Sequence, residues 1–115
     1  MSNRSRSRLA AGRPGHAPVF AALGDETRLA LLTELSAGQA RSISELTRGS
    51  RLTRQAITKH LRVLESVGIV HGVHAGRESR FAFNPRPIEE LKQYLERVSE
   101  QWDQALGRLK SFVES

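Results

Sequence analysis

The chain contains no cysteine, and this absence removes several classes of function at once. Disulfide frameworks, thiolate nucleophiles and cysteine-based zinc sites all require a sulfur atom that the sequence does not supply. The sequence also has no glycine-rich phosphate loop and no recognisable motif that groups serine, histidine and an acid. A hydrolytic or redox enzyme is therefore the least favoured class, and we expect a protein that is not an enzyme and needs no cofactor.

Long apolar runs are missing as well. No stretch approaches the roughly 18 to 20 consecutive apolar residues of a membrane span, and the basic N-terminal segment is not followed by a hydrophobic signal core. The absence of cysteine is also consistent with a reducing compartment. We expect a cytoplasmic protein with no membrane partner.

Positive charge is abundant and unevenly distributed. The 115 residues carry a net charge of +6, and the excess lies in residues 1–17 (+4) and residues 41–80 (+5). Such a balance in a small domain indicates nucleic acid or an anionic membrane as the partner. Residues 1–17 are rich in Ser, Arg, Gly and Pro without an apolar period, which predicts a disordered basic tail, either a solvated leader or an arm that contacts DNA. Residues 18–113 are expected to form one domain.

Capping residues divide the first half of this domain into four helices. A short helix runs from Pro18 to Leu23, and Asp25 can cap a second helix that ends before Gly38 and carries an apolar face of Leu29, Leu31, Leu32 and Leu35. The segment 42–45 is a capping box for a short third helix, and Thr53 can cap a longer fourth helix that Gly68 closes. A short helix, a four-residue turn and a longer helix are typical of a helix-turn-helix.

The second half predicts a β-hairpin and one long helix. Two β-prone runs, 69–73 and 79–83, flank a turn that contains Gly76, and this hairpin would be a wing. The last helix, from Pro87 to about Val113, carries an apolar stripe whose members step by three or four: Ile88, Leu91, Leu95, Val98, Trp102, Leu106 and Leu109. Because so small a domain cannot cover this stripe by itself, we expect a second copy of the chain to cover it.

The fourth helix has one apolar and one polar face. Its apolar side is formed by Ile57, Leu61 and Leu64, and its polar side by Arg54, Gln55, Thr58, Lys59 and Arg62. Arg and Lys can pair with guanine or phosphate, Gln with adenine, and Thr offers a hydroxyl and a methyl group. Such a face can simply be exposed to solvent. Here it occurs together with the caps, the turn and the wing, which favours contact of this face with the major groove of double-stranded DNA. Arg77 and Arg80 flank the tip of the wing and would reach the adjacent minor groove or phosphates.

The order of these elements and several segments resemble the ArsR/SmtB family of regulators. The segments are 22–28 (Ala-Leu-Gly-Asp-Glu-Thr-Arg), 44–46 (Ser-Glu-Leu), 52–65, which includes the recognition helix, and 67–70 (Val-Gly-Ile-Val). The resemblance covers roughly residues 18–113. It implies a mainly α winged helix-turn-helix with a small β-hairpin, a dimer formed by the first and last helices, and repression through a palindromic operator.

Residue by residue, the resemblance assigns two sets of positions. The DNA-binding set is Thr53, Arg54, Gln55, Thr58 and Lys59, with His60 and Arg62 as phosphate or packing residues and Arg77 at the wing tip. The dimer interface set, which the first and last helices supply, is Val19, Phe20, Leu23, Leu91, Leu95, Val98, Trp102, Leu106 and Leu109. Trp102 is either an anchor of this interface or part of an effector pocket.

The metal sites of the family are not reproduced. Metal-sensing members have two cysteines before the third helix, where this chain has Ser42 and Ser44, and serine is a poor ligand for soft metals. Other members use Asp and His on the last helix, but residues 87–113 contain no histidine. His71 and His74 would point to opposite faces of a strand. We expect no metal, and the effector is unknown.

Two other functions remain open from the sequence. One is a repressor that responds to a metal or small molecule at a non-standard site. The other is a nonspecific basic protein that binds nucleic acid mainly through charge.

Overall fold

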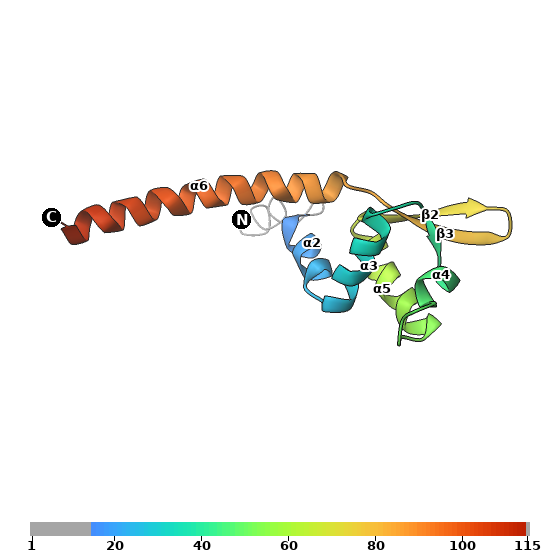
Figure 1. The fold of residues 1–115 in the computed structure, drawn as a ribbon. Helices are drawn as coiled ribbons and strands as arrows, with labels where there is room; N and C mark the ends of the chain where they lie inside the picture. The colour runs from blue at the N-terminus through green and yellow to red at the C-terminus, as the bar shows by residue number, and fades with distance from the viewer. Residues whose placement is uncertain (1–14, 115) are drawn as a thin grey trace, which may run out of the picture.

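The structure of the chain is a computed structural model that describes residues 15–114. The elements follow in the order α2 (His16–Leu23), α3 (Glu26–Ser36), β1 (Arg41–Ser42), α4 (Ile43–Thr47), α5 (Arg54–Ser66), β2 (Val70–Ala75), β3 (Glu78–Phe83) and α6 (Arg86–Glu114). Figure 1 shows α2 to α5 gathered into one body, from which the β2–β3 hairpin extends on one side and α6 on the other. This is the predicted order of helices, hairpin and last helix.

Side chains cap three of the helices where the sequence predicts it. The Asp25 carboxylate accepts a hydrogen bond from the Arg28 amide at 3.0 Å, which lowers the pKa of Asp25. The Thr53 hydroxyl accepts from the Ala56 amide at 3.1 Å, and α4 begins with a complete capping box. The predicted start of the domain needs a correction, because α2 begins at His16 and residues 16–17 are helical rather than part of a tail. The rest of the predicted tail, residues 1–14, lies outside the described residues.

The core lies where α3, α4, α5 and the start of the hairpin meet. Its buried members are Val19, Ala22, Leu31, Leu32, Leu35, Leu46, Ile57, Leu61, Leu64, Ile69, Val70 and Leu91. Leu29, predicted on the same face as its neighbours, is 47% exposed. At about 100° per residue, Leu29 lies at the edge of the face that Leu31, Leu32 and Leu35 bury.

The hairpin is part of a three-stranded antiparallel sheet with the strand order β1-β3-β2. Strand β2 pairs with β3 from Val70↔Phe83 to Ala75↔Glu78, and Gly76 in the turn has a φ of +67° that favours glycine. The two strands are longer toward the tip than predicted. Strand β1, which was not predicted from the sequence, pairs Ser42 with Arg80 and joins the wing directly to the start of α4.

The first turns of helix α6 pack against α2. Its Tyr94 ring stacks on His16 of α2 with ring centroids 4.3 Å apart, and Phe20 approaches the same ring edge-on at 6.3 Å. Beyond this contact the helix extends past α2 in Figure 1. Its exposed large apolar side chains are Leu95, Trp102, Leu106, Leu109, Phe112 and Val113, while Val98 is half-buried.

The structure corrects two residues of the predicted dimer interface. Val19 is 7% exposed and Leu91 is 4% exposed, and both belong to the core of the chain itself. They therefore have almost no surface left to bury against a partner. Of the predicted residues on α2, Phe20 remains exposed and Leu23 is half-buried.

Candidate nucleic-acid interface

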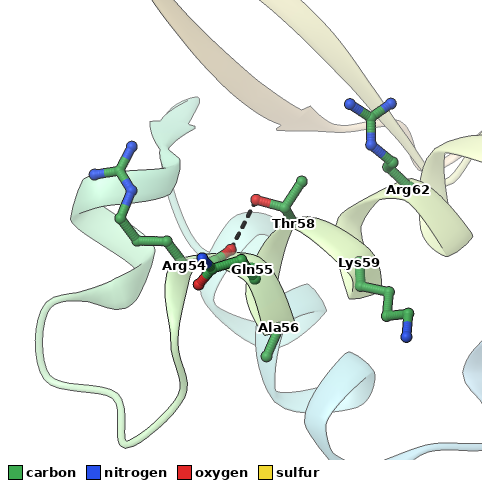
Figure 2. Close-up of a pocket in the computed structure, with 6 residues that line it drawn as sticks. All are labelled: Arg54, Gln55, Ala56, Thr58, Lys59 and Arg62. Atoms are coloured by element: carbon green, nitrogen blue, oxygen red, sulfur yellow. Dashed lines mark hydrogen bonds between the residues drawn. The ribbon is translucent and has the colours of Figure 1, made fainter.

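Helix α5 has one buried apolar face and one largely polar outer face. Ile57, Leu61 and Leu64 are each 0% exposed and hold one face of the helix against the core. The side chains of Arg54, Gln55, Lys59 and Arg62 are exposed, and Thr58 is half-buried between them. Together with Ala56 these five residues line a shallow depression on the outer face of the helix (Figure 2). The structure thus brings the predicted base-reading residues of α5 onto one surface.

Hydrogen bonds already engage part of this surface. The Thr58 hydroxyl donates to the Arg54 carbonyl at 2.7 Å, so only its oxygen lone pairs and its methyl group are left to contact a ligand. Thr53 uses its hydroxyl oxygen as the cap of α5. Gln55, Lys59 and Arg62 are exposed, and their side chains can reach a ligand on this face.

Arg54 connects α5 to the preceding helix. Its Nη1 donates a hydrogen bond to the Ser44 hydroxyl of α4 at 2.7 Å, which leaves most of the five guanidinium N–H donors available. This contact of Ser44 could not be predicted from the sequence, because its partner lies ten residues away along the chain.

His60 belongs to the interior side of α5. The half-buried ring places Nδ1 3.4 Å from Nη1 of Arg28. Arg28 in turn donates from Nε to the carbonyl of Ala22 at 2.6 Å and from Nη2 to that of Ala21 at 3.2 Å, in the last turn of α2. Of the two predicted roles for His60, phosphate contact or packing, the structure therefore favours packing.

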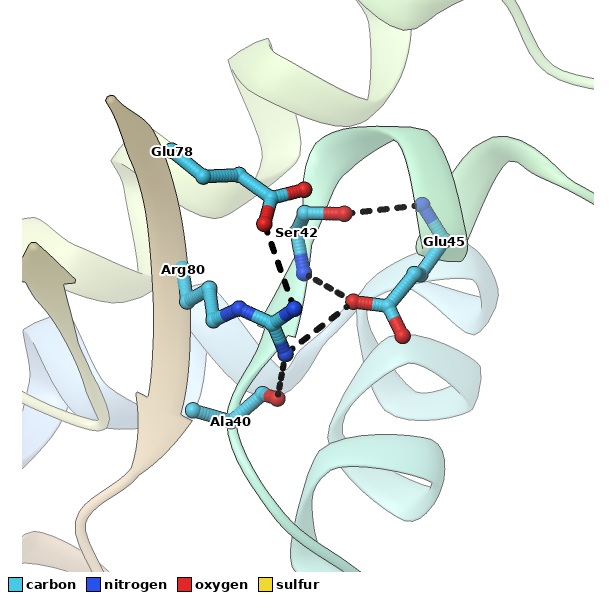
Figure 3. Close-up of polar contacts among 5 residues, drawn as sticks. All are labelled: Ala40, Ser42, Glu45, Glu78 and Arg80. Carbon is cyan, nitrogen blue, oxygen red and sulfur yellow. Dashed lines mark hydrogen bonds and ion pairs between the residues drawn. The ribbon is translucent and has the colours of Figure 1, made fainter. Parts of the chain in front are cut away.

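The two arginines of the wing have different surroundings. Arg77 is exposed in the turn between the strands. The prediction that Arg80 flanks the tip needs correction, because Arg80 lies within β3 opposite Val73 and Ser42. Its guanidinium is within 3.3 Å of the Glu45 carboxylate, 3.2 Å of the Glu78 carboxylate and 3.3 Å of the Ala40 carbonyl (Figure 3).

The Glu45 carboxylate contacts both the capping box of α4 and Arg80 of the wing. Its Oε1 accepts from the Ser42 amide at 3.0 Å as well as facing Arg80. The hydrogen bond from the Ser42 amide, helped by the Ser42 hydroxyl and the charge of Arg80, lowers the pKa of Glu45. The capping box was predicted from the sequence, but its link to the wing was not.

Across residues 15–114 no group of three or more His, Asp or Glu side chains has an arrangement that could hold a metal ion, and His71 and His74 are both exposed. No helix in this part of the chain is long and apolar enough to cross a membrane.

Helices α4 and α5 are capped at their starts and are joined to a β-hairpin. Helix α5 has a buried inner face and an exposed polar outer face. This arrangement defines the winged helix-turn-helix class. Comparison with known proteins agrees with this class. Residues 23–73 match the model of a helix-turn-helix domain family. An uncharacterized HTH-type transcriptional regulator of Bacillus subtilis, YuzN, is 40% identical over 79 residues, which cover 64% of this chain and 86% of the relative.

Solved structures identify the family within the class. An ArsR-like transcriptional regulator from Rhodococcus is 40% identical, with a TM-score of 0.76 over 84% of this chain and 91% of that one. The homodimeric winged helix-turn-helix domain of Mb0332 from Mycobacterium bovis shares the fold at 19% identity, with a TM-score of 0.59 over 76% of this chain and 82% of that one. The chain belongs to the ArsR-like family of helix-turn-helix transcriptional regulators.

Proposed function

We propose that this regulator is a homodimeric repressor that binds a palindromic operator sequence-specifically and without a metal ligand. The observation that carries the proposal is the outer face of α5, on which Gln55, Lys59 and Arg62 are exposed beside Arg54. A helix of this kind fits the major groove, where Gln can pair with adenine and Arg with guanine. Arg77, which is exposed in the turn of the wing, would contact a phosphate or the minor groove.

The exposed part of α6 supports the dimer. Trp102 is 64% exposed, and Leu106 and Leu109 are each 58% exposed, on a helix whose first turns already pack on α2. A continuous apolar stripe of this size on a small protein marks an interaction site. A second copy is the favoured occupant because a palindromic site requires two recognition helices related by two-fold symmetry, as the homodimeric neighbour of the same fold illustrates.

Selection of duplex DNA by the full-length protein from a random library tests this function. We expect enrichment of an inverted repeat whose half-sites lie about one helical turn apart, roughly 34 Å. Enrichment of no sequence, with equal affinity for random duplexes at fixed salt, would favour nonspecific binding through charge instead.

Substitutions then separate base reading from charge. Gln55→Ala should relax the preference at one base position and weaken the selected site by about 1 to 3 kcal/mol, the range of a good bidentate contact. Lys110→Ala is the matched control for general charge, because Lys110 lies near the far end of α6 with Glu114 as an ion-pair partner at 3.9 Å. If Gln55→Ala and Arg54→Ala both leave the base preference unchanged, the assignment of the recognition helix fails.

The same DNA complex tests the absence of a metal. Addition of a chelator, and titration with Zn²⁺, should leave its affinity unchanged if no metal ligand is involved. A reproducible loss of affinity on metal addition would identify a metal-responsive repressor.

A further inference from the structure

The two faces of strand β3 serve different parts of the molecule. Ser79 and Phe81 line a cleft of about 260 Å³ between the wing and α5, to which Thr58 and Arg62 contribute from the helix. Because side chains alternate along a strand, Arg80 projects from the other face. There its guanidinium reaches Glu45 of α4 and the Ala40 carbonyl before β1.

The contacts of Arg80 fix the strand to two other segments. A guanidinium presents its donors in a rigid planar fork, so acceptors on different segments restrain it more than a single acceptor would. The Glu45 oxygen that faces Arg80 is the same oxygen that the capping box holds through the Ser42 amide. The start of α4 and the middle of β3 are therefore connected through one carboxylate, as Figure 3 shows.

We propose that Arg80 is a positioning residue, which sets the wing relative to the recognition helix and so places Arg77 for its contact with DNA. Arg80 does not contact the DNA itself, since its charge is directed to Glu45 and Glu78. The lowered pKa of Glu45 agrees with a carboxylate that remains charged beside Arg80. This inference rests on the proposed function.

Two substitutions that remove the same charge test the link. Glu45→Gln keeps an oxygen that can accept from the Ser42 amide but loses the ion pair between α4 and β3. Glu78→Gln removes a carboxylate from the same guanidinium, but Glu78 lies only two residues away on the same strand, so its ion pair with Arg80 ties β3 to no other described element. We expect Glu45→Gln to weaken binding to the selected duplex about two- to fivefold, the range of an exposed ion pair, and Glu78→Gln to cause no loss.

If Arg80 contacts DNA directly, the two substitutions should change the affinity for the duplex in the opposite direction. Each substitution would then free Arg80 and remove a negative charge near the phosphates, so both variants would bind more tightly. Equal effects of the two substitutions, or tighter binding by Glu45→Gln, overturn the proposal. Circular dichroism of each variant establishes that the helices and the hairpin remain folded.

A double-mutant cycle between Arg80→Ala and Arg77→Ala provides the second test. In the natural protein we expect Arg80→Ala to weaken DNA binding and to lower the salt dependence of the affinity. In the Arg77→Ala variant, we expect Arg80→Ala to change neither the affinity nor its salt dependence. A further decrease of about 0.9 in the salt slope on adding Arg80→Ala to Arg77→Ala would mark an independent phosphate contact and overturn the proposal. A natural chain that selects no duplex at all would overturn the proposed function together with this inference.

Discussion

Leu95 and Leu29 offer a controlled test of the dimer. Their side chains are 46% and 47% exposed, but Leu95 lies on the α6 stripe whereas Leu29 lies on α3. Replacement of either by alanine preserves helix propensity and removes a similar apolar area. Only Leu95→Ala is expected to weaken self-association, because only Leu95 has its exposed part in the proposed interface.

The magnitude follows from the exposed fraction. Complete burial of a leucine side chain contributes about 1.5 to 3 kcal/mol, and about half of Leu95 remains to be covered. The loss is then about 0.7 to 1.5 kcal/mol per protomer, and about 1.5 to 3 kcal/mol in a dimer that contains two copies. This corresponds to a dimer dissociation constant about 10 to 100 times higher.

Sedimentation equilibrium over a wide range of concentrations measures this constant for the natural protein and both variants. Thermal unfolding, followed by circular dichroism, reports the share of the effect that comes from weaker packing within one chain. Equal dissociation constants for Leu95→Ala and Leu29→Ala would refute the assignment of α6 as the interface. The reasoning would also fail if the natural protein sediments as a monomer at every concentration.

Three further predictions concern the stability of the fold. Leu61 is 0% exposed in the core, so Leu61→Ala should lower the free energy of unfolding in urea by about 2 to 5 kcal/mol. Gly68→Ala should destabilise the protein by about 1 kcal/mol because its φ is +80°, whereas Gly107→Ala in helix α6 should stabilise it slightly, and equal signs would contradict this. In the folded state the pKa of Glu45 lies below its ordinary value of 4.5, so the charged carboxylate stabilises the fold. This contribution to the free energy of unfolding is fully present above pH 4.5 and is lost as the pH falls through the folded pKa. Urea unfolding between about pH 6 and pH 3 should therefore show a shallower acid loss for Glu45→Gln than for the natural protein.

The features best predicted from the sequence are those that depend on residues close together along the chain. The caps at Asp25, Ser42 and Thr53 lie where expected because a cap and the amide it accepts from are three residues apart. The inner and outer faces of α5 were predicted for the same reason, since helical periodicity alone defines them.

Contacts between distant segments could not be predicted in this way. Strand β1 is two residues long and exists only because it pairs with β3, about 40 residues later. Arg80 resembled a DNA contact because its carboxylate partner Glu45 lies on another element. Leu91 continues the apolar stripe of α6, and periodicity does not reveal where the core of the chain ends and the exposed part begins.

The length of α6 also bears on the DNA that the protein can occupy. The helix has 29 residues and is therefore about 43 Å long, and each turn advances 5.4 Å along its axis. In a dimer built on this helix, the turn at which the two copies cross determines how far apart the two half-sites lie. Because both copies shift together, moving the crossing by one turn changes the separation of the half-sites by up to about 11 Å, or about three base pairs, so substitutions far from the DNA can alter the preferred operator spacing.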